Sequence, residues 1–567
     1  MNAVETLRIQ LERFELLLSV SRALASERDR DRLLERILLE AKRISRADGG
    51  TLYLRTDDDQ LRFAILRNDT LGIAFGGSAP PPEGFPSIPL FLPDGRPNLH
   101  NVATYAVHAR RGVRIDDAYH AEGFDFTGAK RMDAETGYRS TSFATVPLID
   151  SQGYVIGVLQ LINAVDPETK AVLPFREDDQ VILEALAAQA GVALENQLLL
   201  DGQKRLLESV IQMLASAIDS KSPYTGGHCE RVPELVLSLV RAACEDDSGP
   251  FADFQLDDEG WYELRIAAWL HDCGKVVTPV HVMDKATKLE TIFDRLELVH
   301  TRLSLRAAEI EAEAYKRAAR GECTLEEAEA EAMRQRLALL EDYRFLEKAN
   351  VGTEFLGEEA KAKIASFTAP KVKLLDGERT LLTEDEARNL SISRGTLTDE
   401  ERLIINGHMV ETIRMLEALP FPRGLRRVPE YAGGHHERMD GKGYPRGIYA
   451  GDMSIPARAM AIADVFEALT AQDRPYKKGK TLSETMRIMG SMKADNHLDP
   501  DLFDLFVRSG VYKQYAERML PPELIDEVDE AALLAIRPKP FELPPKEVRD
   551  QRWRDFLEEY RQLLRRR

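Results

Sequence analysis

The stretch from 177 to 219 contains no proline, and its apolar residues recur at helical spacing. They are Val181, Leu183, Leu186, Ala190, Val192, Leu194, Leu198, Leu199, Leu200, Leu206, Leu207, Val210, Ile211 and Leu214. This periodicity predicts one continuous helix that leaves one domain and enters the next. Two arrangements fit it: a parallel coiled coil with a second copy of the chain, which we favour, or a helix packed on its own domain. Separate cores are therefore expected before and after the helix.

The composition agrees with several domains, because 567 residues are too many for a single hydrophobic core. A hydrophobic content of 44% and a charged content of 30% are typical of a soluble globular protein. The net charge of −19 opposes binding to a nucleic acid polymer or to an anionic membrane. Four cysteines without a CxxC pair indicate a reducing compartment. With no signal-like or membrane-spanning stretch, the predicted location is the cytoplasm.

The region before the long helix has the pattern of an α+β domain. Residues 1–29 predict an N-terminal helix, and 30–197 combine helical and strand patterns. Strands are expected at 50–55, 142–147 and 154–163, and Asp150 to Gly153 between the last two is a hairpin signal.

The region after the long helix predicts an all-α domain over 223–535, reached through a linker helix over 177–222 and followed by a helical tail over 536–567. Within it, 281–396 is rich in Ala, Glu, Arg and Leu and predicts a long helical insertion. Capping boxes are expected where Thr324, Thr383 and Thr398 each precede a glutamate by three residues. We favour a solvated helical hairpin for the insertion over a partner-docking arm.

Two adjacent histidines, His435 and His436, precede Glu437 and a Gly-Tyr-Pro turn, and His271-Asp272 ends an apolar helix upstream. Imidazoles together with a carboxylate suit iron, manganese or zinc and can leave a coordination position open. These residues therefore predict a shared metal site. Cys229 and Cys273 adjoin it, and we favour small buried residues over thiolate ligands.

The segment from about 220 to 520 resembles the HD-GYP family, bacterial phosphodiesterases that hydrolyse cyclic di-GMP. The resemblance rests on Tyr224 to Val232, His271 to Lys275, His435 to Pro445, Ile462 to Leu469 and Arg474 to Lys477. It implies an HD-superfamily helical domain with a pair of metal ions bridged by Asp272. The metal ligands that it implies are His228, His271, Asp272, His435, His436 and Asp464. It also implies catalytic roles for Asp272 and Lys275, and substrate contacts for Lys275, Arg474, Lys477 and, in the Gly-Tyr-Pro loop, Tyr444.

One more histidine ligand is implied, on a helix between the two histidine motifs, and two residues fit its spacing. His300 follows Leu289 and His408 follows Leu397 by the same distance. The family pattern places a Leu-Thr-x-Glu-Glu sequence at the start of that helix, and Leu397 to Glu401 matches it. We therefore favour His408, which makes 281–396 an insertion of unusual length, and leave His300 as the alternative.

Three departures from the family pattern limit the resemblance. Glu467 stands where the family has an aspartate, and one extra residue precedes Arg474. Some members with three metals carry a glutamate at the position of Tyr224, so two divalent ions are expected here, iron or manganese.

Residues 30–197 resemble a GAF domain through Asp133 to Ser140, Thr145 to Pro147 and Gly157 to Asn163. The resemblance implies an antiparallel sheet with flanking helices and a ligand pocket on one face. Cyclic-nucleotide-binding GAF domains carry a lysine after the asparagine and an aspartate after the phenylalanine. Here Ala164 and Arg176 occupy those positions. A dimerisation and signal-relay role is favoured over nucleotide binding, and the GAF ligand stays unidentified.

Together these features predict a multidomain, homodimeric sensory hydrolase in which a GAF domain controls metal-dependent hydrolysis of cyclic di-GMP to pGpG or GMP. Two alternatives stay open. One is a phosphohydrolase that acts on another cyclic dinucleotide or nucleotide, and the other is a non-catalytic cyclic di-GMP receptor.

Overall fold

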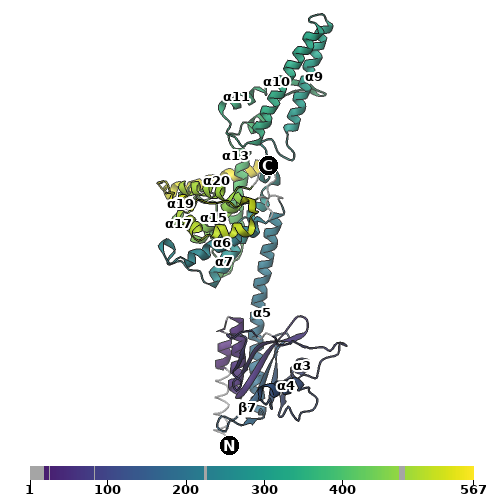
Figure 1. Cartoon of the computed structure of the whole chain (residues 1–567), viewed down its shortest axis with the longest axis vertical. Helices are drawn as coiled ribbons and strands as arrows, with labels where there is room; N and C mark the ends of the chain where they lie inside the picture. Colours follow the sequence, from purple (N-terminus) through teal and green to yellow (C-terminus); the bar gives the residue numbers. More distant parts are fainter. Residues whose placement is uncertain are drawn as a thin grey trace. The chain divides into compact units, whose positions relative to one another are not determined.

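The computed structural model describes residues 18–24, 26–27, 29–81, 84–221, 227–471 and 479–566. The chain divides into two compact units, 1–207 and 208–567 (Figure 1). Of the predicted N-terminal helix, residues 18–24 are helical and 1–17 lie outside the described residues.

The first unit is built on an antiparallel sheet with the strand order β3-β2-β1-β7-β6-β5. Two short strands, β4 and β8, pair with β2 and β7 respectively. The strands are β1 (Ala47–Arg55), β2 (Gln60–Asn68), β3 (Ile73–Phe75), β4 (Ile88–Pro89), β5 (Val113–Ile115), β6 (Phe143–Ile149), β7 (Val155–Val165) and β8 (Val172–Leu173). The three strands predicted from the sequence lie in β1, β6 and β7, and the predicted hairpin joins β6 to β7.

Helices cover both faces of this sheet, because side chains alternate along each strand. Leu52 and Leu54 of β1 join one core with α2 (Arg30–Ser45) and the first part of α5 (Glu177–Asp219). Tyr53 belongs to a second core with α3 (Val102–Ala109), and α4 (Thr127–Thr136) follows β5. The predicted α+β class of this region is confirmed.

The long helix predicted from the proline-free stretch is α5, which runs unbroken from Glu177 to Asp219. Its buried apolar residues Leu183, Leu186, Ala190 and Leu194 belong to the core of the first unit.

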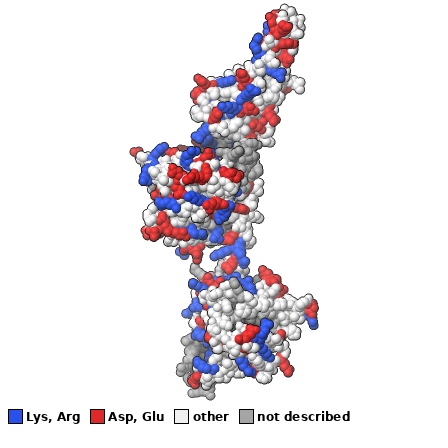
Figure 2. Space-filling model, in the orientation of Figure 1, with Lys and Arg blue, Asp and Glu red and all other residues white. Residues whose placement is uncertain are grey.

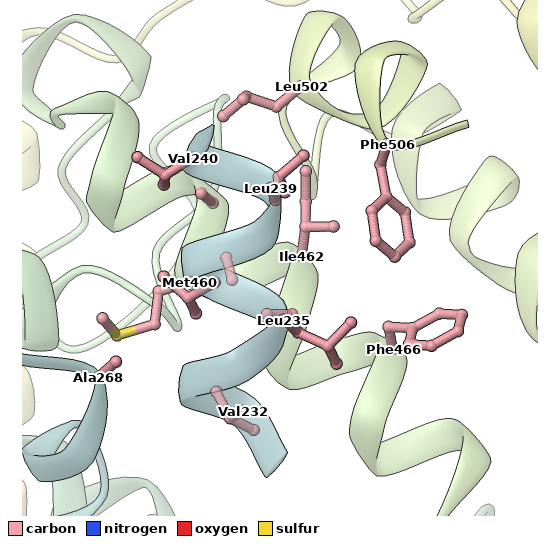
Figure 3. Packing of buried hydrophobic residues seen from close by; sticks show 14 of the residues in the cluster. Val232, Leu235, Leu239, Val240, Ala268, Met460, Ile462, Phe466, Leu502 and Phe506 are labelled. Atoms are coloured by element: carbon pink, nitrogen blue, oxygen red, sulfur yellow. The ribbon is translucent and has the colours of Figure 1, made fainter. Parts of the chain in front are cut away.

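The second unit is mainly helical, and α6 (His228–Glu245) lies in its core (Figure 3). Apolar residues along α6, such as Val232 and Leu239, pack against α7 (Asp258–Leu270), α15 (Ile455–Thr470) and α17 (Pro500–Arg508). A short helix, α8 (Val280–Met283), lies at the start of the insertion. The remaining α-helices of this unit outside the insertion are α13 (Asp399–Ala418), α14 (Val428–Gly433), α16 (Leu482–Ala494), α18 (Val511–Met519), α19 (Glu530–Ala535) and α20 (Lys546–Arg566).

The insertion contains a helical hairpin of α9 (Leu296–Ala319) and α10 (Leu325–Val351), which lie side by side in Figure 1. It continues through α11 (Glu358–Ser366), a two-stranded hairpin of β9 (Lys371–Leu374) and β10 (Gly377–Thr380), and α12 (Glu384–Leu390). The three predicted capping boxes are present, at the starts of α10, α12 and α13. The strand hairpin was not predicted, although Asp376-Gly377, where the turn enters β10, is a turn signal.

The insertion has a small hydrophobic core of its own, which includes Leu303, Leu346 and Leu382. Two buried lysines tie its ends together. Lys285 pairs with Glu401 at 2.8 Å, and the Nζ of Lys288 donates to the carbonyls of Leu390 and Ile392 at 3.0 and 2.8 Å. The chain thus leaves and re-enters the helical domain at nearly the same place.

Acidic and basic side chains are interspersed on the face shown in Figure 2. Among the described residues, no helix is both long and apolar enough to span a bilayer.

Candidate metal centre

Residues from separate parts of the second unit converge on one buried site. His228 begins α6, while His271 and Asp272 lie between α7 and the 3₁₀ turn η2 (Cys273–Val277). The other contributors are His408 on α13, His435 and His436 directly after α14, and Asp464 on α15.

These side chains form two adjacent clusters, each of which could hold a metal ion. The first cluster is His228, His271, Asp272 and Asp464, and the second is Asp272, His408, His435 and His436. Within each cluster the possible ligand atoms lie within 4.8 Å of one another. Asp272 is the residue that the two clusters share.

The two oxygens of Asp272 face different clusters. Oδ2 lies 3.3 Å from Nε2 of both His228 and His271. Oδ1 lies 3.3 Å from Nε2 of His408 and 3.9 Å from Nε2 of His435. A carboxylate placed in this way can bridge two ions.

Local hydrogen bonds orient three of the imidazoles. The Nδ1 atoms of His271, His408 and His435 each lie within hydrogen-bond distance of the backbone carbonyl three residues earlier, in Ala268, Ile405 and Ala432. Donation from Nδ1 leaves Nε2 as the acceptor, directed into the cluster. Such bonds to the ring's second nitrogen are the usual support of a metal-binding histidine.

The site contains buried polar atoms that have no hydrogen-bond partner. They are Nε2 of His228, His271, His408 and His435, and Oδ1 of Asp272. Leaving such atoms unsatisfied costs about 1–3 kcal/mol each, so their concentration at one point requires an explanation. Divalent ions would satisfy all of them, and a set of imidazoles and carboxylates suits such ions.

Electrostatics favour the protonation states that metals bind at Asp272, His435 and His436. At His228 burial lowers the pKa of the imidazole, but the carboxylates of Asp272, Asp464 and Glu467 outweigh burial and hold that pKa well above its usual range, so a metal ion must displace a proton there. Burial raises the pKa of Asp272, but the Lys275 ammonium and His271 outweigh burial and hold that pKa well below its usual range. Burial lowers the pKa of His435 to about 4, with His271 adding to the effect. Burial also lowers the pKa of His436. An ionised bridging carboxylate beside the neutral imidazoles of His435 and His436 is ready to bind cations.

The two neighbouring cysteines belong to neither cluster. Burial raises the pKa of Cys273 to about 12 and raises that of Cys229 as well. Both thiols are therefore neutral near pH 7, in agreement with small buried residues rather than thiolate ligands.

Glu467 holds His228, a role that the sequence interpretation did not assign. Its side chain is buried, with one oxygen accepting from Nδ1 of His228 and the other 2.6 Å from the Arg231 guanidinium. The signal was present in the sequence, since Glu467 lies three residues after Asp464 and so projects from the same face of α15.

We expect Glu467→Gln to weaken metal binding roughly 10- to 100-fold, because partners of metal ligands contribute on this scale. Isothermal titration with Mn²⁺ measures the effect. Glu263→Gln is the matched control, since Glu263 is also buried but accepts from the backbone N–H of Arg427, away from the clusters. Equal affinities for Glu467→Gln and the unmodified protein would contradict the role.

The other predicted site residues take different places. Lys275 Nζ lies 2.5 Å from Oδ2 of Asp272, and the Tyr444 ring stacks on His436 with centroids 4.8 Å apart. Arg474 and Lys477 lie outside the described residues.

Only one of the two candidate histidines, His300 and His408, lies in the metal centre. His408 belongs to the second cluster. His300 lies exposed on α9 of the insertion, with its ring 4.7 Å from that of Tyr343.

Two family models match this chain. Residues 29–194 match the GAF domain, and residues 384–502 match the HD domain. The chain carries a GAF domain and an HD domain. The HD match contains His408, His435, His436 and Asp464, whereas His228, His271 and Asp272 precede the insertion. The buried site therefore joins the matched HD residues to a segment that the insertion separates from them.

Curated relatives match short parts of this chain. It is 43% identical over 115 residues to a 3'3'-cGAMP-specific phosphodiesterase of Vibrio cholerae, which is 20% of this chain and 26% of that protein. It is 40% identical over 119 residues to a cyclic di-GMP phosphodiesterase of Pseudomonas aeruginosa (21% and 28%). It is 36% identical over 114 residues to a cyclic di-GMP phosphodiesterase of Thermotoga maritima (20% and 30%). The chain thus matches about a quarter to a third of the length of these relatives.

Proposed function

We propose that this chain is an HD-GYP-type phosphodiesterase that opens cyclic di-GMP to pGpG, and on to GMP, under the control of its GAF domain. The observation that carries the proposal is the pair of buried clusters that share Asp272. The Gly-Tyr-Pro loop beside the second cluster and the names of the relatives support the same class of substrate.

In this proposal the seven clustered residues hold two divalent ions, iron or manganese, which when bound supply Lewis acidity toward a phosphodiester. Burial lowers the pKa of Lys275, but Asp272 and Asp464 outweigh it and raise that pKa, so the ammonium stays protonated. It can donate a hydrogen bond to a phosphate oxygen or to the leaving oxygen. Burial raises the pKa of Tyr444, which keeps its hydroxyl as a donor beside the site. Arg474 and Lys477 are proposed as further contacts to phosphate or guanine.

The test is incubation of the purified full chain, loaded with Mn²⁺ or anaerobically with Fe²⁺, with cyclic di-GMP. We expect pGpG to accumulate first and GMP to follow, as resolved by ion-pair chromatography. Metal analysis on the same preparation should give two ions per chain. Tight binding of cyclic di-GMP without turnover in either metal form would instead support a receptor.

A second candidate substrate is 3'3'-cGAMP, which is favoured by the 43% identity to a relative of that specificity. The two substrates differ in one base, so the metal centre cannot discriminate between them. A comparison of kcat/KM for both dinucleotides on one enzyme preparation decides the question.

We also propose a homodimer formed through α5. Apolar side chains are exposed on this helix at every seventh residue: Val192 is 46% exposed, Leu199 57%, Leu206 66% and Met213 63%. A heptad repeat is the pattern of a coiled-coil seam. A second copy of α5 would cover these residues.

We expect the double substitution Leu199→Glu with Leu206→Glu to convert the dimer to a monomer, because it places charge in the apolar seam. Light scattering after size exclusion measures the mass. Lys204→Glu, at an exposed position five residues after Leu199 and so on the side of the helix away from the seam, is the control and should leave the mass unchanged. A monomeric unmodified chain at micromolar concentration would contradict the proposed dimer.

A further inference from the structure

Lys221, which lies just after α5, forms hydrogen bonds to the turn that follows the bridging Asp272. The Nζ of Lys221 donates to the backbone carbonyls of Lys275, Val276 and Thr278, at 3.1, 2.5 and 2.6 Å. These carbonyls belong to η2 and the residue after it, which lead directly out of Asp272. One ammonium thus satisfies three carbonyls at the end of a single turn.

The last residue of α5 makes a second contact of this kind. Asp219 is buried, and its Oδ2 accepts a hydrogen bond from the backbone N–H of Cys229 at 3.0 Å. Cys229 is the second residue of α6 and follows the metal-site residue His228. A carboxylate at this place satisfies one of the free N–H groups at the helix start and complements the helix dipole.

The two contacts reach the two segments whose side chains must meet. His228 Nε2 and Asp272 Oδ2 are 3.3 Å apart, although they belong to different segments of the chain. Catalytic and metal-binding groups must be held to within about 0.5 Å of their working geometry. Asp219, the last residue of α5, holds the first segment, and Lys221, two residues beyond it, holds the second.

We propose that Asp219 and Lys221 are positioning residues that set the distance between His228 and Asp272. Through them the chain at and just after the end of α5 contacts the backbone next to His228 and the turn after Asp272, so a rotation of α5 about its axis would alter that distance. The effect on turnover rests on the proposed function, whereas the effect on backbone order does not.

The test compares Lys221→Met, which keeps the length of the side chain but removes its donors, with Asp219→Ala and with the conservative Lys221→Arg. Lys493→Met is the matched control. Like Lys221, Lys493 donates to a backbone carbonyl, that of Leu533. It is buried and pairs with Asp504, away from the metal site. Three quantities are measured on the full chain: Mn²⁺ affinity, kcat and KM for cyclic di-GMP, and hydrogen–deuterium exchange of 228–232 and 272–278.

For Lys221→Met and Asp219→Ala we expect Mn²⁺ affinity and kcat to fall roughly tenfold or more, while KM changes less than twofold. Exchange should rise in 272–278 for the lysine variant and in 228–232 for the aspartate variant. Lys221→Arg should recover most of the affinity and kcat.

Affinity, kcat and exchange that stay within twofold of the unmodified protein would overturn the proposal. So would an equal loss in Lys493→Met, which would show general destabilisation. If the unmodified chain neither binds Mn²⁺ nor turns over substrate, the proposed function fails. The exchange pattern then still decides whether Asp219 and Lys221 order these two segments.

Discussion

Replacing Asp272 with asparagine is expected to abolish hydrolysis of cyclic di-GMP and to empty both metal clusters. Asparagine keeps the shape of the side chain but removes the charge that faces both sets of imidazoles. The expected loss in kcat exceeds about 10³-fold, because removal of a single preorganised electrostatic group already costs roughly 10²–10³. Metal content, measured by elemental analysis after desalting, should fall from two ions per chain toward none.

Asp499→Asn is the matched control for this experiment. Asp499 is a buried carboxylate of the same unit, but it caps α17 and pairs with Arg458 away from the clusters. This variant should lose stability and keep its metals. Retention of both ions by Asp272→Asn would refute the bridging role.

Gly274→Ala is expected to separate the second cluster from the bridging aspartate. A Cβ at Gly274 would lie 2.0 Å from the backbone carbonyl oxygen of His408 and 2.5 Å from the backbone nitrogen of Thr412. Both atoms are part of the α13 backbone, so the helix or the turn must move. His408 would then move away from Oδ1 of Asp272, which lies 3.3 Å from its Nε2.

The expected cost of this overpacking is about 1–3 kcal/mol in the free energy of unfolding, measured by urea denaturation. The metal content should fall toward one ion per chain. His408 on α13 belongs to the second cluster only, whereas His228, His271 and Asp464 of the first cluster lie on other elements. Gly357→Ala is the control, since the space around Gly357 is open and its φ is −76°. Full metal content in Gly274→Ala would show that α13 adapts without moving His408.

The sequence pattern predicted the structure well where a feature depends on residues that are close together in the sequence. The absence of proline and the apolar stripe predicted α5, and capping boxes predicted the starts of α10, α12 and α13. The motifs also identified the residues that the structure brings together in two clusters.

Spacing alone did not separate His300 from His408, but the sequence at the start of the helix, Leu397 to Glu401, favoured His408, which the structure places in the second cluster. Pattern failed where only tertiary contacts decide. The part played by Glu467 depends on α6 and α15 meeting side by side. The contacts of Lys221 depend on how the chain leaves α5. Nothing in the sequence around this lysine indicates that its ammonium donates to three backbone carbonyls.

The way the insertion is fastened has a consequence for how the metal centre forms. Asp272 and His408 are far apart in sequence, and the entropy lost on closing a flexible loop grows with its length. Lys285 and Lys288 clamp the two ends of the insertion, which also folds around its own core. Once that core has formed, the chain between Asp272 and His408 consists of the folded insertion and two short connecting segments. The entropy lost when the two residues come together is therefore smaller than their separation in the sequence suggests.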